Sequence, residues 1–494
     1  MADRAESEEF AQHSHRDAMF GIVPLVRKER IFGFLDMTFV LSALAIATWA
    51  FLTGGDMAFF VGFEAGVAAM VLGFAIAIFF VIISLLPNTK WGLEHFVFLR
   101  SIFGRHGVKP LIYIVNFLII IGWMGILAIM FGRAATNVVN VLVGTGYGGD
   151  HIVVVLFGLL ALVISWLVVV KGPVALKWMN RIAAPGLFVV IIVMLVFLFA
   201  ENSYSDLAVI QPLEPFGNKI VDFMMVVEFN AAAALSWWVA LGNTTRFGKS
   251  QRGCAWAQVI GFFVVGMVAQ AVGFIAALSY GDADPTAWMI PLTGSTVGVL
   301  ILVWIGFANI TSISVSSYMT LVALRQEGVR WLANANWGVL AAVFLGLSAL
   351  LLIRPSAVYD NFFQFLLWLG LVYAPLVGLV VFDYYILRRQ QIDMRALFDT
   401  RKGSPYDFWG GWNIGAYICV GIGVVTYLLL LNPISLWYSA PFPYLTATVP
   451  SLIIPGIAYL LMVRFWLRRV GRGGYAIPAG AVASPSPVKA GVGS

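Results

Sequence analysis

The sequence predicts an all-α integral membrane protein that crosses the bilayer twelve times. Apolar residues make up 61% of the 494 residues and charged residues only 11%, whereas soluble domains carry roughly 25% charged residues. The apolar residues gather into runs near or above the roughly 20 residues that a membrane-spanning helix needs. Lysine and arginine are concentrated in every second loop between these runs, as in multi-pass membrane proteins.

Twelve apolar segments follow one another and are joined by short loops, without a second soluble domain. Residues 1–30 are polar and form a predicted cytoplasmic arm that lacks the apolar core of a signal peptide. The tail 471–494 is rich in Gly, Ala, Pro and Ser, a composition typical of disorder. The segments are 33–53, 61–86, 110–132, 151–170, 179–200, 222–244, 255–279, 294–322, 335–353, 361–387, 411–431 and 444–466.

The basic residues predict the orientation. With a cytoplasmic N-terminus, 27 of the 30 lysines and arginines fall in inner segments, and only Arg133, Lys219 and Arg354 lie outside. This asymmetry follows the positive-inside rule and predicts a plasma-membrane protein with both termini in the cytoplasm. It also explains the net charge of +6 without a nucleic-acid partner.

Motifs of soluble enzymes are absent or out of context. Gly144, Gly146 and Gly149 match a dinucleotide-binding pattern but lie in an outer loop rather than between a strand and a helix. The five histidines have no metal-ligand spacing. The two cysteines, Cys254 and Cys419, lie in apolar surroundings. The sequence therefore predicts a protein that is not an enzyme.

The stretch Val226–Thr245, which makes up most of the sixth segment, carries polar groups that a plain lipid anchor would avoid. Buried polar groups and interrupted backbone occur at membrane depth where they line a cavity. We therefore expect a binding site here, with a weakened helix near Gly242 and Asn243. The other notable residues are Glu228, Asn230, the alanines 231–234, and the pair Trp237 and Trp238.

Three of the acids within the apolar segments are candidates for a functional role. Asp36 and Asp383 are near helix ends, where an acid paired with nearby arginines is the favoured interpretation. Glu228 lies about six residues from the start of its segment, so a cavity-facing position and a position at the outer headgroups carry equal weight.

Three further segments carry candidate binding groups. The eighth holds the hydroxyl-rich run Asn309–Tyr318, which can join helices or ligate a sodium ion through oxygen atoms. Small residues in Ser42–Trp49, before Gly54 and Gly55, would let the first helix break and direct carbonyls at an ion. In the third segment, Trp123 lies between two glycines and suits either a flat ligand or packing.

Four stretches together resemble the nucleobase–cation symporters, the family of cytosine, purine and hydantoin permeases. They occur in the expected order and cover most of the chain. They are RSIFGRHG at 100–107, KWMN at 177–180 followed by Ala184-Pro185, DYYILRR at 383–389, and YDFWGGWN at 406–413.

The resemblance implies a LeuT-like fold. Segments one to five (residues 31–200) and six to ten (201–390) would be inverted repeats, followed by two peripheral helices in 391–470. The first and sixth helices would be discontinuous at mid-membrane.

The resemblance also implies the site. Substrate would lie between Trp123 and a tryptophan of the sixth helix, for which Trp238 is preferred and Trp237 is the close alternative. Sodium would lie between helices one and eight. Its predicted ligands are the carbonyls of Ala43 and Ile46 and the hydroxyls of Thr311 and Ser312.

Departures from the family pattern argue against a hydantoin substrate. Leu127 replaces a glutamine of the hydantoin carriers, and Ile313 or a nearby serine, Ser314, replaces a substrate-binding asparagine. Glu228, Asn230 or Asn243 can supply replacement polar contacts.

The predicted function is import of a nucleobase or related planar heterocycle by Na⁺ or H⁺ symport. Thr311 and Ser312 favour sodium, whereas Glu228 offers protons a carrier. The alternatives are a transporter of another small polar solute and, less favoured, a channel. The expected partners are the small-molecule substrate and the bilayer, with no cofactor beyond the coupling ion and no obligate protein partner.

Overall fold

The structure, a computed structural model, describes residues 24–327, 332, 334–399 and 401–475. The predicted N-terminal arm up to residue 23, and the predicted tail beyond residue 475, lie outside these residues. The described part is helical, and its extended pairings are isolated bridges rather than strands. The all-α prediction is therefore confirmed for this part of the chain.

The first half of the chain forms long helices with two breaks. Most loops between the helices contain glycine, proline or polar residues, which weaken or cap helices, whereas the gap between α2 and α3 consists of Ile46 and Ala47. The elements are η1 (Arg27–Glu29), α2 (Phe34–Ala45), α3 (Thr48–Met57), α4 (Phe63–Trp91), α5 (His95–Phe103), α6 (Val108–Pro110), η2 (Leu111–Leu118), α7 (Ile119–Val143), α8 (Ile152–Lys171), α9 (Pro173–Glu201), α10 (Tyr204–Val209), α11 (Lys219–Leu235) and α12 (Trp238–Thr245).

The second half continues this pattern. The long α15 contains a non-helical residue at Gly294, with φ 74°, which separates a short outer helix from the span that follows. The elements are α13 (Gln251–Ala257), η3 (Gln258–Val264), α14 (Val265–Tyr280), α15 (Pro285–Glu327), α17 (Trp337–Ser348), η4 (Ala349–Ile353), α18 (Pro355–Asp360), α19 (Phe362–Val381), η5 (Phe382–Leu387), α20 (Ile414–Leu430), α21 (Phe442–Leu445), α22 (Thr448–Met462) and η6 (Val463–Leu467).

Nine of the described helices or helix combinations are long and apolar enough to cross a membrane, and the bent pair α2–α3 would make a tenth. Two shorter apolar helices, Trp337–Ile353 and Ile414–Leu430, lie at the positions of the ninth and eleventh predicted segments. With the bent pair counted, helices long and apolar enough to cross a membrane lie at ten of the predicted segments, and shorter apolar helices lie at the other two.

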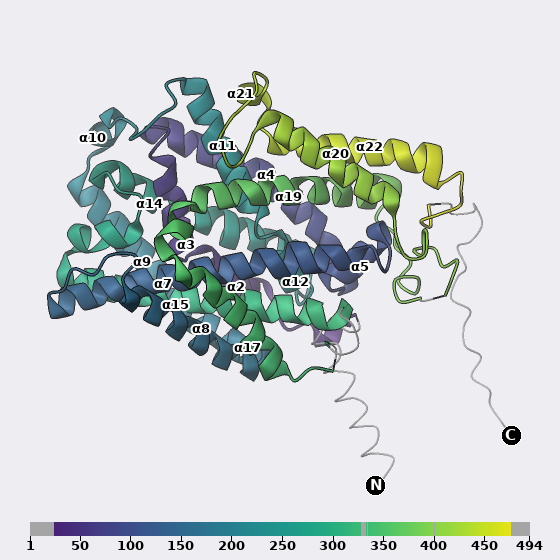
Figure 1. The fold of residues 1–494 in the computed structure, drawn as a ribbon, viewed down its shortest axis with the longest axis horizontal. Coiled ribbons are helices and arrows are strands. Elements are labelled where there is room, and N and C mark those ends of the chain that lie inside the picture. Colours follow the sequence, from purple (N-terminus) through teal and green to yellow (C-terminus); the bar gives the residue numbers. More distant parts are fainter. Residues whose placement is uncertain (1–23, 328–331, 333, 400, 476–494) are drawn as a thin grey trace, which may run out of the picture.

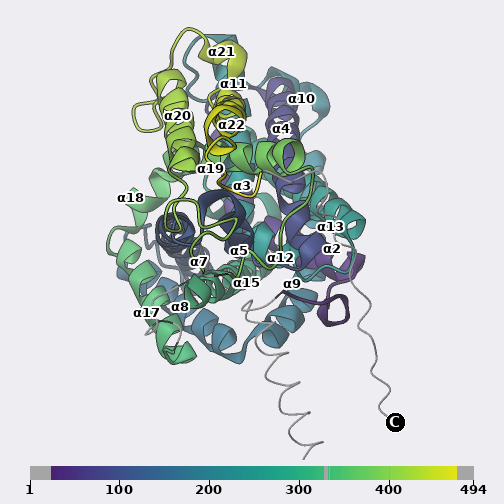
Figure 2. The same cartoon turned by 90° about the vertical axis from the view of Figure 1, so that its right-hand side faces the viewer.

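The interrupted helices lie inside the bundle. In the ribbon, α20, α21 and α22 lie together on one side and α8 and α17 on the other (Figures 1 and 2). Helix α14 packs on α3, α15 packs on α7, and α11 packs on α4. Broken backbone is therefore shielded from lipid, as unsatisfied peptide groups require.

Close packing at the first break depends on glycine. A Cβ atom at Gly54 would lie 1.9 Å from the carbonyl oxygen of Gln270 in α14, and one at Gly55 would lie 2.4 Å from the carbonyl oxygen of Ala283. These glycines let the outer half-helix α3 pack closely against α14 and the loop that follows it. The break itself lies at Ile46 and Ala47, within the run Ser42–Trp49 whose small residues predict it.

Candidate functional site

The first helix breaks between α2 and α3. The two halves meet at 56°, and Ile46 (φ −100°, ψ 80°) and Ala47 (φ −136°, ψ 175°) leave helical geometry. Trp49 donates its indole N–H to the carbonyl of Leu44 at 3.1 Å. Helix ends leave carbonyls without intrahelical partners, and Ala43 and Ile46, the predicted carbonyl ligands, both lie at this end.

Asn309 in α15 holds this break in place. Its Nδ2 donates to Oγ1 of Thr48 at 2.8 Å, and its Oδ1 accepts from the backbone N–H of Thr48 at 3.4 Å. Both side chains are buried. The sequence identified Asn309 only as the start of a hydroxyl-rich run. Its role appears once α15 and the start of α3 are seen side by side.

Helices α2 and α15 each carry a buried hydroxyl without a partner among the described residues. Within the described chain, the Oγ atoms of Ser42 and Ser312 are buried without a hydrogen-bond partner. Ser312 follows Asn309 by three residues, so both face the same side of α15. Thr311, by contrast, donates its hydroxyl to the carbonyl of Ala308 at 2.7 Å. Buried unsatisfied hydroxyls are costly and need an explanation, such as a bound ion or water.

The sixth helix breaks between α11 and α12, at Ser236 and Trp237. Trp237 has φ −91° and ψ 0°, and the Ser236 hydroxyl donates to the carbonyl of Ala233 at 2.6 Å. Gly242 and Asn243, where a weakened helix was expected, are regular members of α12. That expectation is wrong. A Cβ atom at Gly242 would lie 2.6 Å from the His95 ring, so this glycine serves close packing.

The two breaks bring aromatic rings together. Trp237 lies 5.1 Å from both Trp49 and Trp123 between ring centroids, and Trp49 lies 6.0 Å from Trp123. Phe262 stacks on Trp49 at 6.2 Å. We call Trp49, Trp123 and Trp237 the tryptophan cluster. All three are buried, and the Trp237 indole nitrogen has no hydrogen-bond partner among the described residues.

Trp238 points elsewhere. Its indole N–H donates to the Ser84 hydroxyl at 2.9 Å, and its ring meets His95 edge-on at 4.3 Å. These contacts are with α4 and α5. The structure therefore brings Trp237, not the preferred Trp238, against Trp123. Consecutive helical residues point about 100° apart, so a one-residue ambiguity in register decides which ring faces the cluster.

The rings of the tryptophan cluster are too close together to hold a flat ligand between them. A flat ligand between two rings needs two van der Waals contacts of about 3.5 Å each, or about 7 Å between the rings. The Trp123 and Trp237 centroids are 5.1 Å apart. Entry of a flat ligand therefore requires one ring to move. Because Trp237 lies at a helix break, its backbone offers that freedom more readily than the regular helix around Trp123.

The other predicted substrate contacts are spread over the bundle. Leu127 is buried on α7, one turn beyond Trp123. The Ser314 hydroxyl donates to the carbonyl of Ile310 at 2.7 Å, and Asn243 accepts from the backbone N–H of His95 at 3.1 Å. Asn230 donates to the carbonyl of Val226 at 2.8 Å. The Ser314 hydroxyl thus has a partner, whereas Asn243 Nδ2 and Asn230 Oδ1 are buried without one among the described residues.

Glu228 caps another helix. Its Oε2 accepts from the backbone N–H groups of Ala447 and Thr448 at 2.8 and 2.9 Å, and its Oε1 accepts from the Thr448 hydroxyl at 2.7 Å. The side chain is 0% exposed, so the carboxylate is enclosed by protein. A carboxylate on the first N–H groups of a helix also complements the helix dipole. Glu228 therefore fastens α11 to the start of α22.

Glu228→Gln is expected to lower the free energy of unfolding by about 2 kcal/mol, because hydrogen bonds to a buried charge are lost. Solute affinity should be unchanged. Reversible unfolding in mixed micelles measures the first quantity, and equilibrium binding measures the second. Glu214→Gln, at an exposed acid, is the control and should leave both unchanged. A selective loss of binding in Glu228→Gln would contradict the capping role.

The two remaining acids are paired with basic residues, as predicted. Asp36 lies 2.7 Å from Arg181 and 3.8 Å from Lys177, and Asp383 lies 2.7 Å from Arg388. Both are helix-end ion pairs.

The chain resembles known permeases in sequence. The profile of a family described as permeases for cytosine/purines, uracil, thiamine and allantoin matches residues 26–443. A hydantoin permease of Microbacterium maritypicum is 22% identical over 444 residues, covering 84% of this chain and 88% of the relative. A cytosine permease of Escherichia coli is also 22% identical, covering 81% and 91%.

Solved structures share the fold. A nucleobase-cation-symport-1 family transporter in a closed conformation with bromovinylhydantoin bound gives a TM-score of 0.71 at 18% identity, covering 90% of this chain and 95% of that one. Its inward-facing conformation gives 0.74 at 17% identity, covering 90% and 93%. A Na⁺-coupled sialic acid symporter gives 0.55 at 14% identity, covering 90% and 92%.

Proposed function

Because the chain belongs to the family of permeases for cytosine/purines, uracil, thiamine and allantoin, we propose that it is a secondary active symporter. In this proposal it imports a nucleobase or a related small planar heterocycle, together with Na⁺ or H⁺, by alternating access. The membership confirms the resemblance to the nucleobase–cation symporters, and a transport function agrees with relatives that are permeases.

One observation carries the proposal. The tryptophan cluster joins the breaks of the first and sixth helices to the regular third helix, α7. Aromatic faces bind flat rings with little dependence on ring identity, and each stacked ring contributes roughly 1–3 kcal/mol. Broken helices allow a site to open towards one side of the membrane and then the other. Such a site suits transport of a planar solute.

The proposed architecture has twelve spans. Residues 31–200 and 201–390 form two inverted repeats, and residues 391–470 supply two peripheral helices. The bent α2–α3 pair and the broken α11–α12 pair support this layout, because they are the first helices of the two repeats. The chain would lie in the plasma membrane with both termini in the cytoplasm, as its basic residues indicate.

Sodium is the proposed coupling ion. A hard cation is bound by oxygen atoms, and the break in the first helix lies beside α15, which carries the unpartnered hydroxyl of Ser312. The predicted carbonyl ligands at Ala43 and Ile46 lie at this break. Ser42, which the sequence did not select as a ligand, has a second unpartnered hydroxyl. Glu228 is bound to α22, so it is a poor proton carrier.

Ser312→Ala is expected to raise the sodium concentration for half-maximal uptake about tenfold, because one oxygen ligand is lost. Uptake into proteoliposomes is measured under a sodium gradient alone and then under a proton gradient alone. Ser348→Ala is the matched control, because that buried hydroxyl is bonded to the Phe344 carbonyl of its own helix at 3.3 Å. Uptake driven equally well by protons without sodium would contradict sodium coupling.

A further inference from the structure

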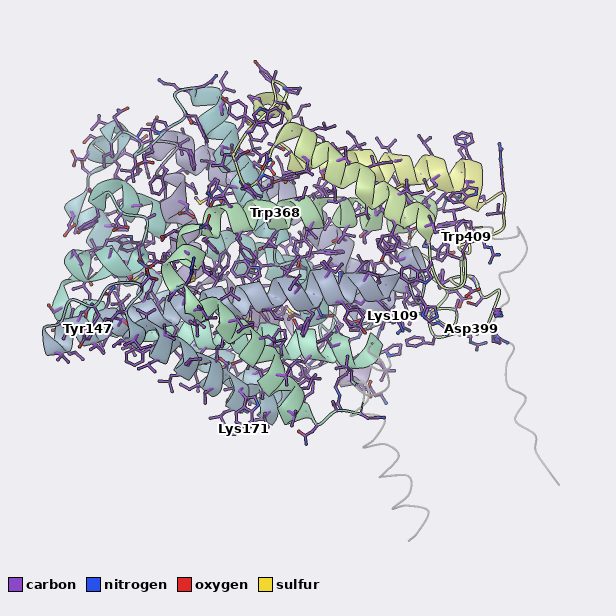
Figure 3. The ribbon with its side chains drawn as sticks, viewed as in Figure 1. Lys109, Tyr147, Lys171, Trp368, Asp399 and Trp409 are labelled. Carbon is purple, nitrogen blue, oxygen red and sulfur yellow. The ribbon has the colours of Figure 1, made fainter. Side chains whose placement is uncertain are left out.

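A chamber of about 570 Å³ opens at one end of the bundle, between α3, α7, α18 and the junction of α14 with α15. Pockets of 300–1,000 Å³ accommodate small organic molecules. Tyr147 lines this chamber and lies at the end opposite Lys109 and Asp399 (Figure 3). Lys109 belongs to a predicted cytoplasmic loop, so the chamber faces outward.

The lining is negatively charged. Four aspartates and one arginine are among its described residues. Arg133 pairs with Asp284 at 3.0 Å and lies 4.1 Å from the ring of Tyr359, whose hydroxyl donates to Asp284 at 2.9 Å. Burial, with the neighbouring Asp284 carboxylate, raises the pKa of Tyr359, so it remains a neutral donor. Asp282 and Asp360 lie outside this ion pair and remain to attract cations.

Two side chains in this chamber, Asp56 and Thr136, each have a buried oxygen without a partner within the described chain, and the Nη1 of Arg133 is also buried without a hydrogen bond. Asp56, on α3, makes no ion pair, and its buried Oδ2 accepts no hydrogen bond. Thr136, on the adjacent α7, is 2% exposed, and its hydroxyl is also unpartnered. A buried polar group without a partner costs about 1–3 kcal/mol. A ligand that donates to the carboxylate and bonds the hydroxyl would recover this cost.

The size and shape of the chamber favour an organic ion over a metal ion. Its volume is far larger than a bare cation requires, and the described residues contain no group of three or more His, Cys, Asp or Glu side chains that could hold a metal. Asp56 follows Trp49 by seven residues on the first helix, which places it about 10 Å outward along α3. The chamber therefore lies on the outer side of the tryptophan cluster.

We propose that the outer chamber is a second binding site, which takes a small organic cation on Asp56 and Thr136. The site holds the cation on the outer side of the tryptophan cluster. Only one part of this assignment rests on the proposed transport function, namely that the cation binds in the chamber before it reaches the tryptophan cluster. Binding in the chamber does not itself depend on transport.

Calorimetric titration of the full chain in nanodiscs tests the site. Thiamine, which carries a permanent positive charge, is the organic-cation probe; sodium is the metal-ion probe and uracil the neutral probe. Titrations are repeated in Trp237→Ala, which isolates the chamber from the tryptophan cluster. Asp56→Asn should raise the Kd for thiamine about tenfold or more, and Thr136→Val about threefold. Uracil binding should respond to neither change.

Two controls separate a local contact from a general charge effect. Asp56→Glu keeps the charge and should retain thiamine binding. Glu214→Gln removes one exposed acid that does not line the chamber and should change the Kd less than about twofold. Absence of thiamine binding by the wild type, or a Kd that a folded Asp56→Asn leaves unchanged, would overturn the proposal. Asp56-dependent binding of sodium alone would overturn the organic-cation assignment.

The symport proposal and the chamber proposal can be contradicted independently of each other. If the wild type accumulates none of the solutes in proteoliposomes but binds thiamine through Asp56, the symport proposal fails and the chamber stands. If uptake is normal and the Kd for thiamine is unchanged in Asp56→Asn, only the chamber assignment fails.

Discussion

Trp237→Ala is expected to reduce uptake to background while the protein still folds. The ring contacts both Trp49 and Trp123 at 5.1 Å and has no hydrogen bond to lose among the described residues. Loss of one stacking face should weaken solute binding by roughly 1–3 kcal/mol, or about 5- to 150-fold. Transport at low solute concentration then falls in proportion. Radiolabelled uptake and equilibrium binding measure the two effects.

The neighbouring tryptophan is the matched control. Trp238→Phe removes the hydrogen bond to Ser84 and should lower stability by about 1 kcal/mol with little change in solute affinity. Trp237→Phe keeps an aromatic face and should retain part of the uptake. The reverse pattern, with Trp238→Phe losing solute affinity and Trp237→Ala retaining it, would show that Trp238 binds the solute, as the sequence favours.

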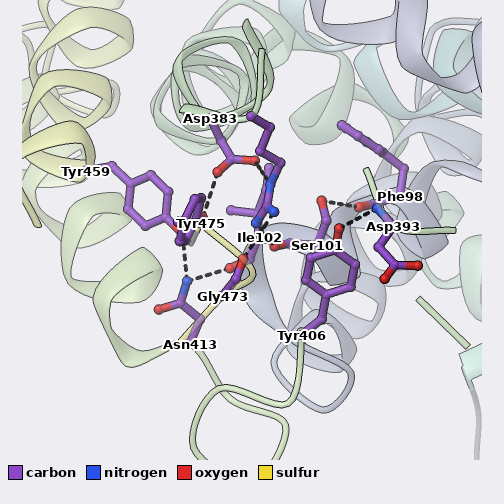
Figure 4. Close-up of polar contacts among 11 residues, drawn as sticks. Phe98, Ser101, Ile102, Asp383, Asp393, Tyr406, Asn413, Tyr459, Gly473 and Tyr475 are labelled. Atoms are coloured by element: carbon purple, nitrogen blue, oxygen red, sulfur yellow. Dashed lines mark hydrogen bonds and ion pairs between the residues drawn. The ribbon is translucent and has the colours of Figure 1, made fainter. Parts of the chain in front are cut away.

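Arg388→Ala is expected to destabilise the protein by about 3–5 kcal/mol, because it leaves the buried Asp383 carboxylate without its cation. The two side chains are 4% and 0% exposed and 2.7 Å apart. Arg388 also donates to the carbonyls of Ser101 and Gly473 at 2.5 and 3.1 Å. Tyr475 donates to Asp383 at 2.7 Å (Figure 4). One guanidinium thus joins α5, η5 and the segment after η6.

Unfolding in mixed micelles measures this effect. Arg401→Ala removes the corresponding arginine from an exposed pair with Asp399, in which Arg401 is 86% exposed and the ions are 2.8 Å apart. Exposed pairs contribute about 0–1 kcal/mol, so the control should unfold almost as the wild type does. Equal losses in Arg388→Ala and Arg401→Ala would mean that burial does not set the strength of the Asp383 pair.

The first residues of the tail that composition predicts to be disordered make defined contacts in the structure. The tail was predicted to be disordered from Gly471, yet Gly473 and Tyr475 are bound to Arg388 and Asp383. Glycine and alanine content describes average behaviour, whereas a single buried tyrosine hydroxyl can hold a short segment. The sequence contained both partners but no indication that they meet.

Hydropathy was sufficient to predict the helices, because membrane helices are selected by length and apolar content. The family motifs then suggested the arrangement, and Trp123 was located from its flanking glycines. Register could not be obtained this way. Whether Trp237 or Trp238 faces Trp123 depends on where the sixth helix breaks, and that break follows a serine rather than a glycine or proline.

Polar side chains were harder to interpret than apolar ones. Glu228 is an unpaired acid in the sequence but a helix cap in the structure, because its partners at Ala447 and Thr448 are 219 and 220 residues away. Asn309 and Thr48 are likewise 261 residues apart. Contacts over such separations leave no periodic pattern, so a single sequence does not reveal them.

Uptake of a radiolabelled nucleobase panel into proteoliposomes, with an imposed sodium gradient, tests the central claim most directly. Symport at the tryptophan cluster predicts accumulation of at least one planar heterocycle, loss of that accumulation in Trp237→Ala, and equilibration without accumulation once the sodium and proton gradients are collapsed. Accumulation that survives collapse of both gradients, or that Trp237→Ala leaves unchanged, would contradict it.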